Sequence, residues 1–115
     1  MYYVTQLHNK MLLLLKHFLF IMNEEEVFSA LSSPTRLMIL RLLTNKAHNI
    51  GELLELLKKY EVNISRRESV YRAVEKLRSA GLVDKFYDNE RKSILYKIKY
   101  EKLIYDFKNG VISFS

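Results

Sequence analysis

The stretch Ser65-Arg-Arg-Glu-Ser-Val-Tyr-Arg-Ala-Val-Glu-Lys-Leu-Arg-Ser-Ala-Gly-Leu-Val83 combines a helix start signal, an amphipathic helix and a helix stop signal. Ser65 and Glu68 have the spacing of a capping box, in which each side chain bonds the backbone N–H of the other. Gly81 permits the left-handed conformation that ends many helices. We therefore predict a helix over 65–79. Its apolar face recurs at helical spacing and consists of Val70, Ala73, Val74 and Leu77.

A β-hairpin is predicted directly after this helix. Residues 82–87 and 93–99 have the character of two strands, separated by the polar tip Asp-Asn-Glu-Arg-Lys at 88–92. In the second strand, Ile94, Tyr96 and Ile98 alternate with Leu95, Lys97 and Lys99. This period of two is typical of a half-buried strand. A short basic helix that leads into a hairpin is typical of a DNA-reading winged helix, with residues 82–99 as the wing.

Helices are also predicted upstream of this unit. Ser33 before Pro34 is a helix start signal and predicts a helix over 34–45. Asn49 can cap a further helix over 50–60. At the N-terminus we expect two helices, the first over about 4–22 and the second starting after Asn23, because three glutamates in a first turn complement the positive helix end.

A last helix is expected over 100–109, because its apolar residues recur at i, i+3, i+4 and i+7 and Gly110 follows. We therefore expect a mainly α (α+β) fold, a winged helix-turn-helix with N- and C-terminal dimerisation helices and a two-stranded β-hairpin wing. The whole chain, 1–115, would form a single domain. Its parts would be an N-terminal helix at 1–22, a winged helix-turn-helix core at 24–99 and a C-terminal helix at 100–109.

Composition narrows the possible functions. The chain has 115 residues and no cysteine, which excludes disulfides, thiolate metal sites and cysteine nucleophiles. The formal charge is +6, and it is concentrated. Residues 65–102 contain eleven Lys and Arg against six Asp and Glu, whereas residues 1–64 contain seven against six. This basic third favours a polyanionic partner, although a solvated, solubilising surface is the alternative explanation.

Residues 11–22, Met-Leu-Leu-Leu-Leu-Lys-His-Phe-Leu-Phe-Ile-Met, are apolar on nearly all sides of a helix. Twelve residues fall short of the roughly 20 that span a bilayer. We expect a second copy of the chain to cover this helix, and core packing and membrane contact are the alternatives. Met22 is also a possible biological start. The expected dimer interface consists of Leu12, Leu15, Phe18, Leu19, Leu103, Ile104 and Phe107.

The outer face of the helix at 65–79 offers hydroxyls and cations that suit double-stranded DNA. Arg72 can make a bidentate contact with guanine in a major groove, and Lys76 is better placed for a phosphate. Each of these side chains could instead be an ordinary exposed residue, and Tyr71 could be a packing residue. The expected DNA-binding residues on the helix and the hairpin tip are Ser65, Arg66, Arg67, Ser69, Tyr71, Arg72, Lys76, Arg91 and Lys92.

Two segments resemble the ArsR type of winged-helix regulators. Residues 30–43, Ala-Leu-Ser-Ser-Pro-Thr-Arg-Leu-Met-Ile-Leu-Arg-Leu-Leu, are similar to the opening signature of that family, and residues 69–83 are similar to its recognition helix and exit. The motifs are less specific against the neighbouring MarR and PadR families. The resemblance implies a homodimeric, usually repressing transcription factor that associates through its terminal helices, about 4–22 and 100–109.

The chain departs from the family pattern in ways that bear on cofactors. The helix at 50–60 contains no Cys or His, and the expected last helix offers only Glu101 and Asp106 as metal ligands. His8, His17 and His48 are scattered, so we expect surface histidines, no metal and no cofactor. The segment before the recognition helix, 58–64, is also longer than usual.

We therefore expect a cytoplasmic, sequence-specific DNA-binding regulator that forms a homodimer and is not an enzyme. No small-molecule substrate and no membrane contact are expected. Three alternatives remain open: a winged helix that binds proteins, a non-specific chromatin-type DNA binder, and a membrane-tethered regulator. The sequence contains no Gly-rich phosphate loop, no paired-His motif and no plausible catalytic Ser, His and acid set.

Overall fold

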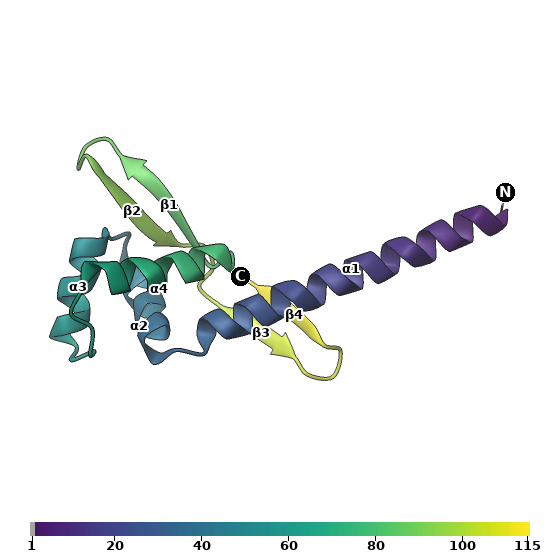
Figure 1. Ribbon diagram of the computed structural model, residues 1–115, viewed down its shortest axis with the longest axis horizontal. Coiled ribbons are helices and arrows are strands. Elements are labelled where there is room, and N and C mark those ends of the chain that lie inside the picture. Colours follow the sequence, from purple (N-terminus) through teal and green to yellow (C-terminus); the bar gives the residue numbers. More distant parts are fainter. Residues whose placement is uncertain (1) are drawn as a thin grey trace.

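Three helices pack around one apolar centre, and two hairpins and a long N-terminal helix surround them in the computed structural model (Figure 1). The structure describes the backbone of residues 2–115 and the side chains of residues 8–14 and 24–115. The elements are α1 (Tyr2–Leu31), α2 (Pro34–Asn45), α3 (Ile50–Lys59), α4 (Arg67–Ser79), β1 (Val83–Asp88), β2 (Ser93–Ile98), β3 (Leu103–Asp106) and β4 (Val111–Phe114).

The core lies where α2, α3 and α4 meet, and the start of β1 and the end of β2 pack against it. Each helix contributes residues three or four positions apart, as an amphipathic helix must when it buries one face. The apolar face predicted for the helix at 65–79 is confirmed, because Val70, Val74 and Leu77 are fully buried. The largest fully buried side chains in the described part of the chain are Ile39, Leu53, Leu57, Leu77, Val70, Val74 and Val83.

The starts of α2 and α3 are those predicted from the sequence. The Ser33 hydroxyl accepts a hydrogen bond from the backbone N–H of Arg36 at 3.2 Å. The Asn49 carboxamide oxygen accepts one from the backbone N–H of Glu52 at 2.8 Å. The Arg36 guanidinium donates to the carbonyls of Ala30 (2.7 Å) and Ser29 (3.1 Å), which ties α2 to the end of α1. These caps satisfy backbone donors that a helix start otherwise leaves unpaired.

The capping box predicted at Ser65 is wrong. Helix α4 begins at Arg67, its N-cap is Arg66, and no side chain that the structure describes caps it. The preceding turn is fixed by Val62 and Ile64, which pack against the core, and by a left-handed residue at Glu61 (φ 60°). This packing leaves Ser65 outside the helix, and Glu68 bonds to Arg72 one turn later instead of reaching back.

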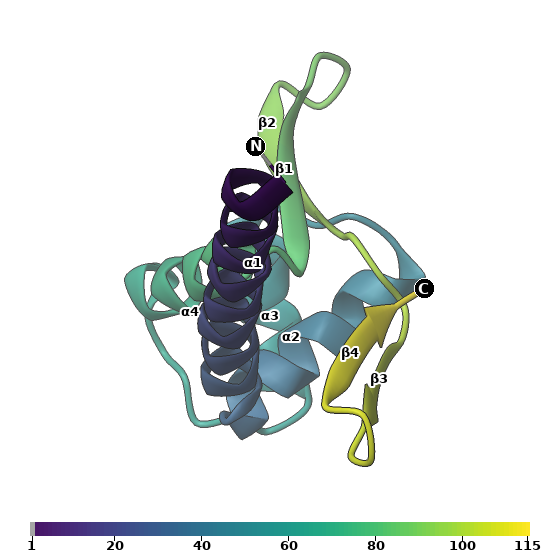
Figure 2. The same ribbon diagram turned by 90° about the vertical axis from the view of Figure 1, so that its right-hand side faces the viewer.

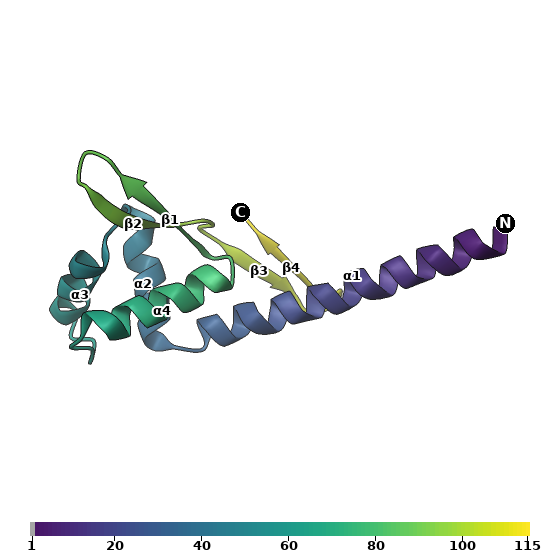
Figure 3. The ribbon, with the colours of Figure 1, turned by 45° about the horizontal axis from the view of Figure 1, so that its top comes forward.

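The predicted break at Asn23 is also wrong, because α1 is one continuous helix from Tyr2 to Leu31. Residues 22–26 contain neither Gly nor Pro, and Asn inside a helix costs only about 0.7 kcal/mol relative to Ala. Val27 and Ala30, in the last turns, are buried against the core and hold that end. The rest of α1 extends away from the body and gives the chain a long dimension of 62 Å (Figures 1 and 3).

The C-terminal dimerisation helix predicted over 100–109 is wrong: β3 and β4 form an antiparallel hairpin there. Leu103 pairs with Phe114 and Tyr105 with Ile112, and alternate residues face the core. The turn is closed by Gly110, at φ 62°, whose N–H bonds the Asp106 carbonyl at 2.8 Å. The aromatic and β-branched residues here favour strands. Residues 100–109 also fit a helical period, but a partner strand after Gly110 pairs with them and stabilises the strand conformation.

The predicted wing is confirmed. β1 and β2 pair antiparallel from Val83 opposite Ile98 to Asp88 opposite Ser93. Gly81 has φ 80° and turns the chain from α4 into β1, as the sequence suggested. His48 forms an isolated antiparallel bridge with Tyr96 and so ties the connector before α3 to the wing. Viewed along α1, the wing and the C-terminal hairpin project in different directions (Figure 2).

Candidate nucleic-acid interface

The outer face of α4 and the turn before it present the predicted DNA-binding residues to solvent. Opposite the buried side chains of Val70, Val74 and Leu77, this face is polar and rich in cations. Tyr71, at the edge of the face, is 45% exposed. All seven residues predicted here are exposed: Ser65, Arg66, Arg67, Ser69, Tyr71, Arg72 and Lys76.

The two central cations of this face differ in their surroundings. The Arg72 guanidinium donates to the Glu68 carboxylate at 2.5 Å, and the two side chains are 75% and 66% exposed. An exposed pair of this kind stabilises a helix by only about 0.3–0.5 kcal/mol, so a stronger acceptor can displace it. Lys76 forms no ion pair with any side chain that the structure describes. Both cations are therefore available to a polyanion.

The wing tip carries the other two predicted residues. The wing runs back from the end of α4, so its tip lies on the α3 side of the molecule (Figures 1 and 3). Arg91 forms an ion pair with Glu52 of α3. Lys92, with a left-handed backbone at φ 50°, is exposed and has no ion pair with a described side chain. Only Lys92 of these two cations is free for a phosphate.

Sequence reasoning missed the residues that hold the wing at α3. His48 was expected on the surface, but it is only 5% exposed, because the bridge to Tyr96 draws it under the wing. Its Nδ1 lies 2.8 Å from the Glu52 carboxylate, so we assign the ring proton to Nδ1. Burial, with Lys46 and Arg91 nearby, lowers the pKa of His48 and favours this neutral form. The spacing of four between His48 and Glu52 was the only signal of this contact.

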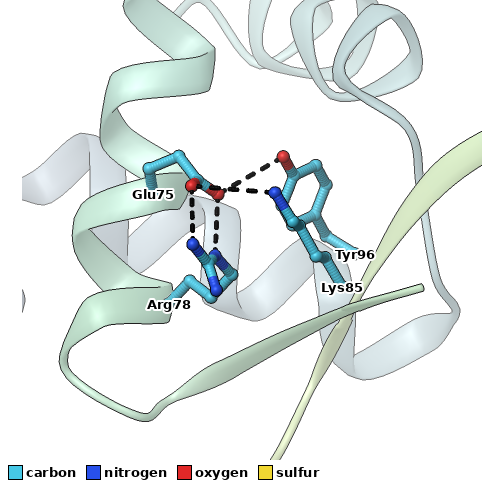
Figure 4. A network of polar contacts seen from close by, with 4 residues as sticks. All are labelled: Glu75, Arg78, Lys85 and Tyr96. Carbon is cyan, nitrogen blue, oxygen red and sulfur yellow. Dashed lines mark hydrogen bonds and ion pairs between the residues drawn. The ribbon is translucent and has the colours of Figure 1, made fainter.

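A second polar cluster joins α4 to both strands of the wing through Glu75 (Figure 4). Its carboxylate accepts two hydrogen bonds from Arg78 at 3.0 Å and one from the Tyr96 hydroxyl at 3.4 Å, and Lys85 lies 4.0 Å away. Arg78 lies three residues after Glu75 on the same helix, whereas Lys85 and Tyr96 come from strands whose register the sequence did not specify.

These contacts shift two pKa values. Hydrogen bonds from Arg78 lower the pKa of the Glu75 carboxyl, so it stays ionised. Burial, together with the neighbouring Glu75 charge, raises the pKa of Tyr96 to about 12. The cluster therefore places the ionised Glu75 carboxylate beside the neutral Tyr96 phenol where α4 meets the wing.

The predicted dimer residues fall into three groups. Leu12 is 42% exposed on α1. Leu15, Phe18 and Leu19 lie outside the described side chains. The other three lie on the C-terminal hairpin: Leu103 is half-buried, Ile104 is 60% exposed and Phe107 is 89% exposed.

Among the described residues, no three or more His, Cys, Asp or Glu side chains gather as a metal site would require. Within that same part of the chain, no helix combines the length and apolarity needed to cross a membrane.

Fold and site together define a winged helix-turn-helix protein. Residues 31–85 match the model of a protein family described as a helix-turn-helix domain. This match covers the helix-turn-helix part of the chain, and the ArsR-type resemblance drawn from the sequence is confirmed at the level of this domain. No curated protein sequence matches the chain.

Solved structures show the same fold. Rv0081 of M. tuberculosis is 29% identical over 65% of this chain and 68% of its own, with a TM-score of 0.53. The transcriptional regulator HlyU from Vibrio vulnificus CMCP6 is 23% identical, covering 76% and 83%, with a TM-score of 0.51. A zinc-bound manganese uptake regulator is 22% identical, covering 81% and 74%, with a TM-score of 0.55. The chain therefore contains a helix-turn-helix domain, and its fold is also that of the transcriptional regulator HlyU.

Proposed function

We propose that the chain is a dimeric, sequence-specific regulator of transcription that binds double-stranded DNA, acts as a repressor and works in the cytoplasm. One observation carries this proposal: α4 buries one face completely and presents hydroxyls and cations on the other, beside an exposed wing. A helix held rigidly from behind can enter a major groove without losing its own packing. The function is binding, and we assign no catalytic residue.

Within the groove, the residues of α4 have different roles. Arg72 exchanges Glu68 for the O6 and N7 atoms of a guanine, which would supply sequence discrimination. Lys76 and the arginines at the helix start, Arg66 and Arg67, contact phosphates and supply affinity without sequence information. Ser65 and Ser69 are short enough to approach the DNA closely. Tyr71, at the edge of the face, contacts the sugar-phosphate backbone.

Of the two predicted cations at the wing tip, only Lys92 forms no ion pair with a described side chain. Lys92 contacts the backbone or the minor groove beside the recognition helix. Arg91 was predicted to do the same, but its ion pair with Glu52 gives it a different role, which is to hold the wing against α3. The wing is thereby placed before DNA arrives.

A second copy of the chain covers α1 in this proposal. Met11, Leu12, Leu13 and Leu14 are between 42% and 69% exposed on a helix that extends away from the body. Such a run of apolar surface on a soluble protein marks an interaction site. A two-fold dimer would place its recognition helices about one DNA turn, roughly 34–36 Å, apart and would read a pseudo-palindrome.

The experiment is a fluorescence anisotropy titration of selected DNA sites with Arg72→Ala and a matched control. The site is first selected from a random duplex library with the unaltered protein. Arg72→Ala should weaken binding to the selected site by about 1–3 kcal/mol and leave binding to a scrambled duplex nearly unchanged. Lys108→Ala, which removes an exposed cation from the C-terminal hairpin, should change neither.

Other outcomes would redirect the proposal. Equal losses on both duplexes would make Arg72 a phosphate contact and favour a non-specific binder. If no duplex binds at any salt concentration, a winged helix that binds proteins becomes the better explanation, with the exposed Phe107 and Ile104 as its surface.

A further inference from the structure

A cavity of about 380 Å³ lies between α2, the base of the wing and the C-terminal hairpin. Its volume falls within the range of about 300–1,000 Å³ that is typical of small-molecule sites. Its walls are mainly apolar, and they come from four parts of the chain that are distant in sequence. The side chains that form them include Leu37, Leu40, Leu82, Ile98, Leu103 and Phe114.

Several contacts hold the cavity open. Tyr100 stacks on Phe114 with ring centroids 4.7 Å apart, which fixes the wall formed by the hairpin. The backbone N–H of Lys99 bonds the Leu82 carbonyl at 3.0 Å, which fixes the base of the wing. Leu37, on the α2 side, remains 45% exposed, so apolar surface faces solvent at the mouth. Nothing in the proposed DNA interface uses this surface.

The mouth carries an excess of positive charge. Arg41 of α2 and Lys102 of the hairpin line it together with a single acid, Glu101. None of the three forms an ion pair with a side chain in the described part of the chain. An apolar interior with one surplus cation at its entrance suits a molecule with an apolar body and one negatively charged end.

We propose that this cavity binds a small carboxylic acid with an apolar body, such as a medium-chain fatty acid, and that its occupancy changes the affinity for DNA. The ligand is an effector and not a substrate. The carboxylate lies at the mouth beside Arg41 and Lys102, and the apolar body lies against Leu40 and Phe114. The second half of the proposal rests on the DNA-binding function proposed above.

The position of the cavity explains how occupancy reaches the DNA interface. Leu82 directly follows Gly81, which turns the chain from α4 into β1, and Ile98 is the last residue of β2. Both ends of the wing therefore touch the ligand. A molecule that fits one wing orientation better than another shifts the wing and α4 toward that orientation, and the coupling must be reciprocal between ligand and DNA.

The test uses the purified full chain and decanoate as the ligand, below its micelle-forming concentration. Decanol is the uncharged control of the same chain length. Anilinonaphthalene sulfonate is the fluorescent probe that a bound ligand displaces. Decanoate should displace the probe from one saturable site per chain. Arg41→Gln should weaken decanoate two- to fivefold, the range of an exposed ion pair, and leave decanol unchanged. Lys108→Gln on the same hairpin, which does not line the cavity, is the control.

A second variant, Leu40→Trp, fills the cavity from α2 and should abolish saturable binding of both compounds, with folding checked by circular dichroism. Decanoate binding that survives Leu40→Trp, or that is matched by decanol and unaffected by Arg41→Gln, would overturn the site. The proposed site would also be overturned if the unaltered chain showed no decanoate site and Leu40→Trp changed the oligomeric state in sedimentation. The cavity would then be an interface between copies of the chain.

The coupling is measured separately by titrating the selected duplex with and without saturating decanoate. A change of threefold or more in DNA affinity, absent in Leu40→Trp, supports regulation. Unchanged affinity with intact decanoate binding overturns the regulatory half alone. If decanoate binds but no duplex does, the site stands and the proposed DNA-binding function fails.

Discussion

Replacement of Glu75 by Ala should loosen the junction between recognition helix and wing. The substitution removes the acceptor of both Arg78 hydrogen bonds and of the Tyr96 hydroxyl. Tyr96 is only 2% exposed, and no other described residue accepts from its hydroxyl. A buried hydroxyl without a partner costs about 1–3 kcal/mol.

The Tyr96 bond is long, at 3.4 Å, so the lower half of that range applies. We expect Glu75→Ala to reduce the free energy of unfolding by about 1–2 kcal/mol. At about 4 °C per kcal/mol for a domain of this size, the midpoint of thermal unfolding should fall by about 4–8 °C. Glu75→Gln keeps an oxygen acceptor for Tyr96 and should lose less than half as much.

Urea and thermal unfolding, followed by circular dichroism, measure both variants. Glu68→Gln is the matched control, since it breaks an exposed pair on the same helix and should cost only about 0.3–0.5 kcal/mol. Equal losses for Glu75→Ala and Glu68→Gln would refute the argument that the Tyr96 hydroxyl depends on Glu75.

The same network has a pH signature. The pKa of Glu75 is lowered in the folded chain, so its contribution is fully present above its ordinary pKa of 4.5 and is lost as pH falls below that value. Glu75→Gln should therefore flatten the acid limb of the stability curve. In an ultraviolet titration of the eight tyrosines, the late ionisation of Tyr96 near 12 should shift to lower pH in Glu75→Gln, since the Glu75 charge no longer adds to the effect of burial on its pKa.

Three further predictions follow from individual residues. Gly81→Ala should cost about 1–2 kcal/mol in urea unfolding, because φ 80° is unfavourable for a residue with a Cβ even though no atom lies within 4 Å of that Cβ. The lowered pKa of His48 means that stability is complete above 6.5 and declines as pH falls below it; His48→Gln should remove this decline in unfolding measured across pH, and an unchanged slope would contradict the assignment. Lys92→Ala should reduce the slope of log affinity against log salt by about 0.9 on duplex DNA, whereas Arg91→Ala should leave it unchanged because Glu52 already neutralises that charge.

The winged helix-turn-helix core could be predicted from the sequence because its signals are local. Ser33, Asn49 and Gly81 each act within three residues of their position, and the buried faces of α3 and α4 follow a single period. The exposed residues of α4 could be predicted for the same reason, since the buried face of a helix fixes its opposite face.

The remaining features depend on contacts between distant segments. Residues 100–109 fit a helical period, but Leu103 and Tyr105 pair with a strand beyond Gly110. No pattern within residues 100–109 indicates that pairing, so a helix was predicted there. The capping box at Ser65 failed because the core holds Ile64 and shifts the helix start. Arg91 could not be distinguished from Lys92, since its partner Glu52 lies on another helix.

Sequence-specific DNA binding is decided by the affinity of the purified chain for duplex DNA from its own upstream region and for a scrambled duplex, measured across a salt series. We expect tight binding to the first duplex, a slope of about −0.9 per phosphate contact, and a preference that persists at physiological salt. Equal affinity for the two duplexes at every salt concentration, or no binding to either, would contradict a sequence-specific regulator.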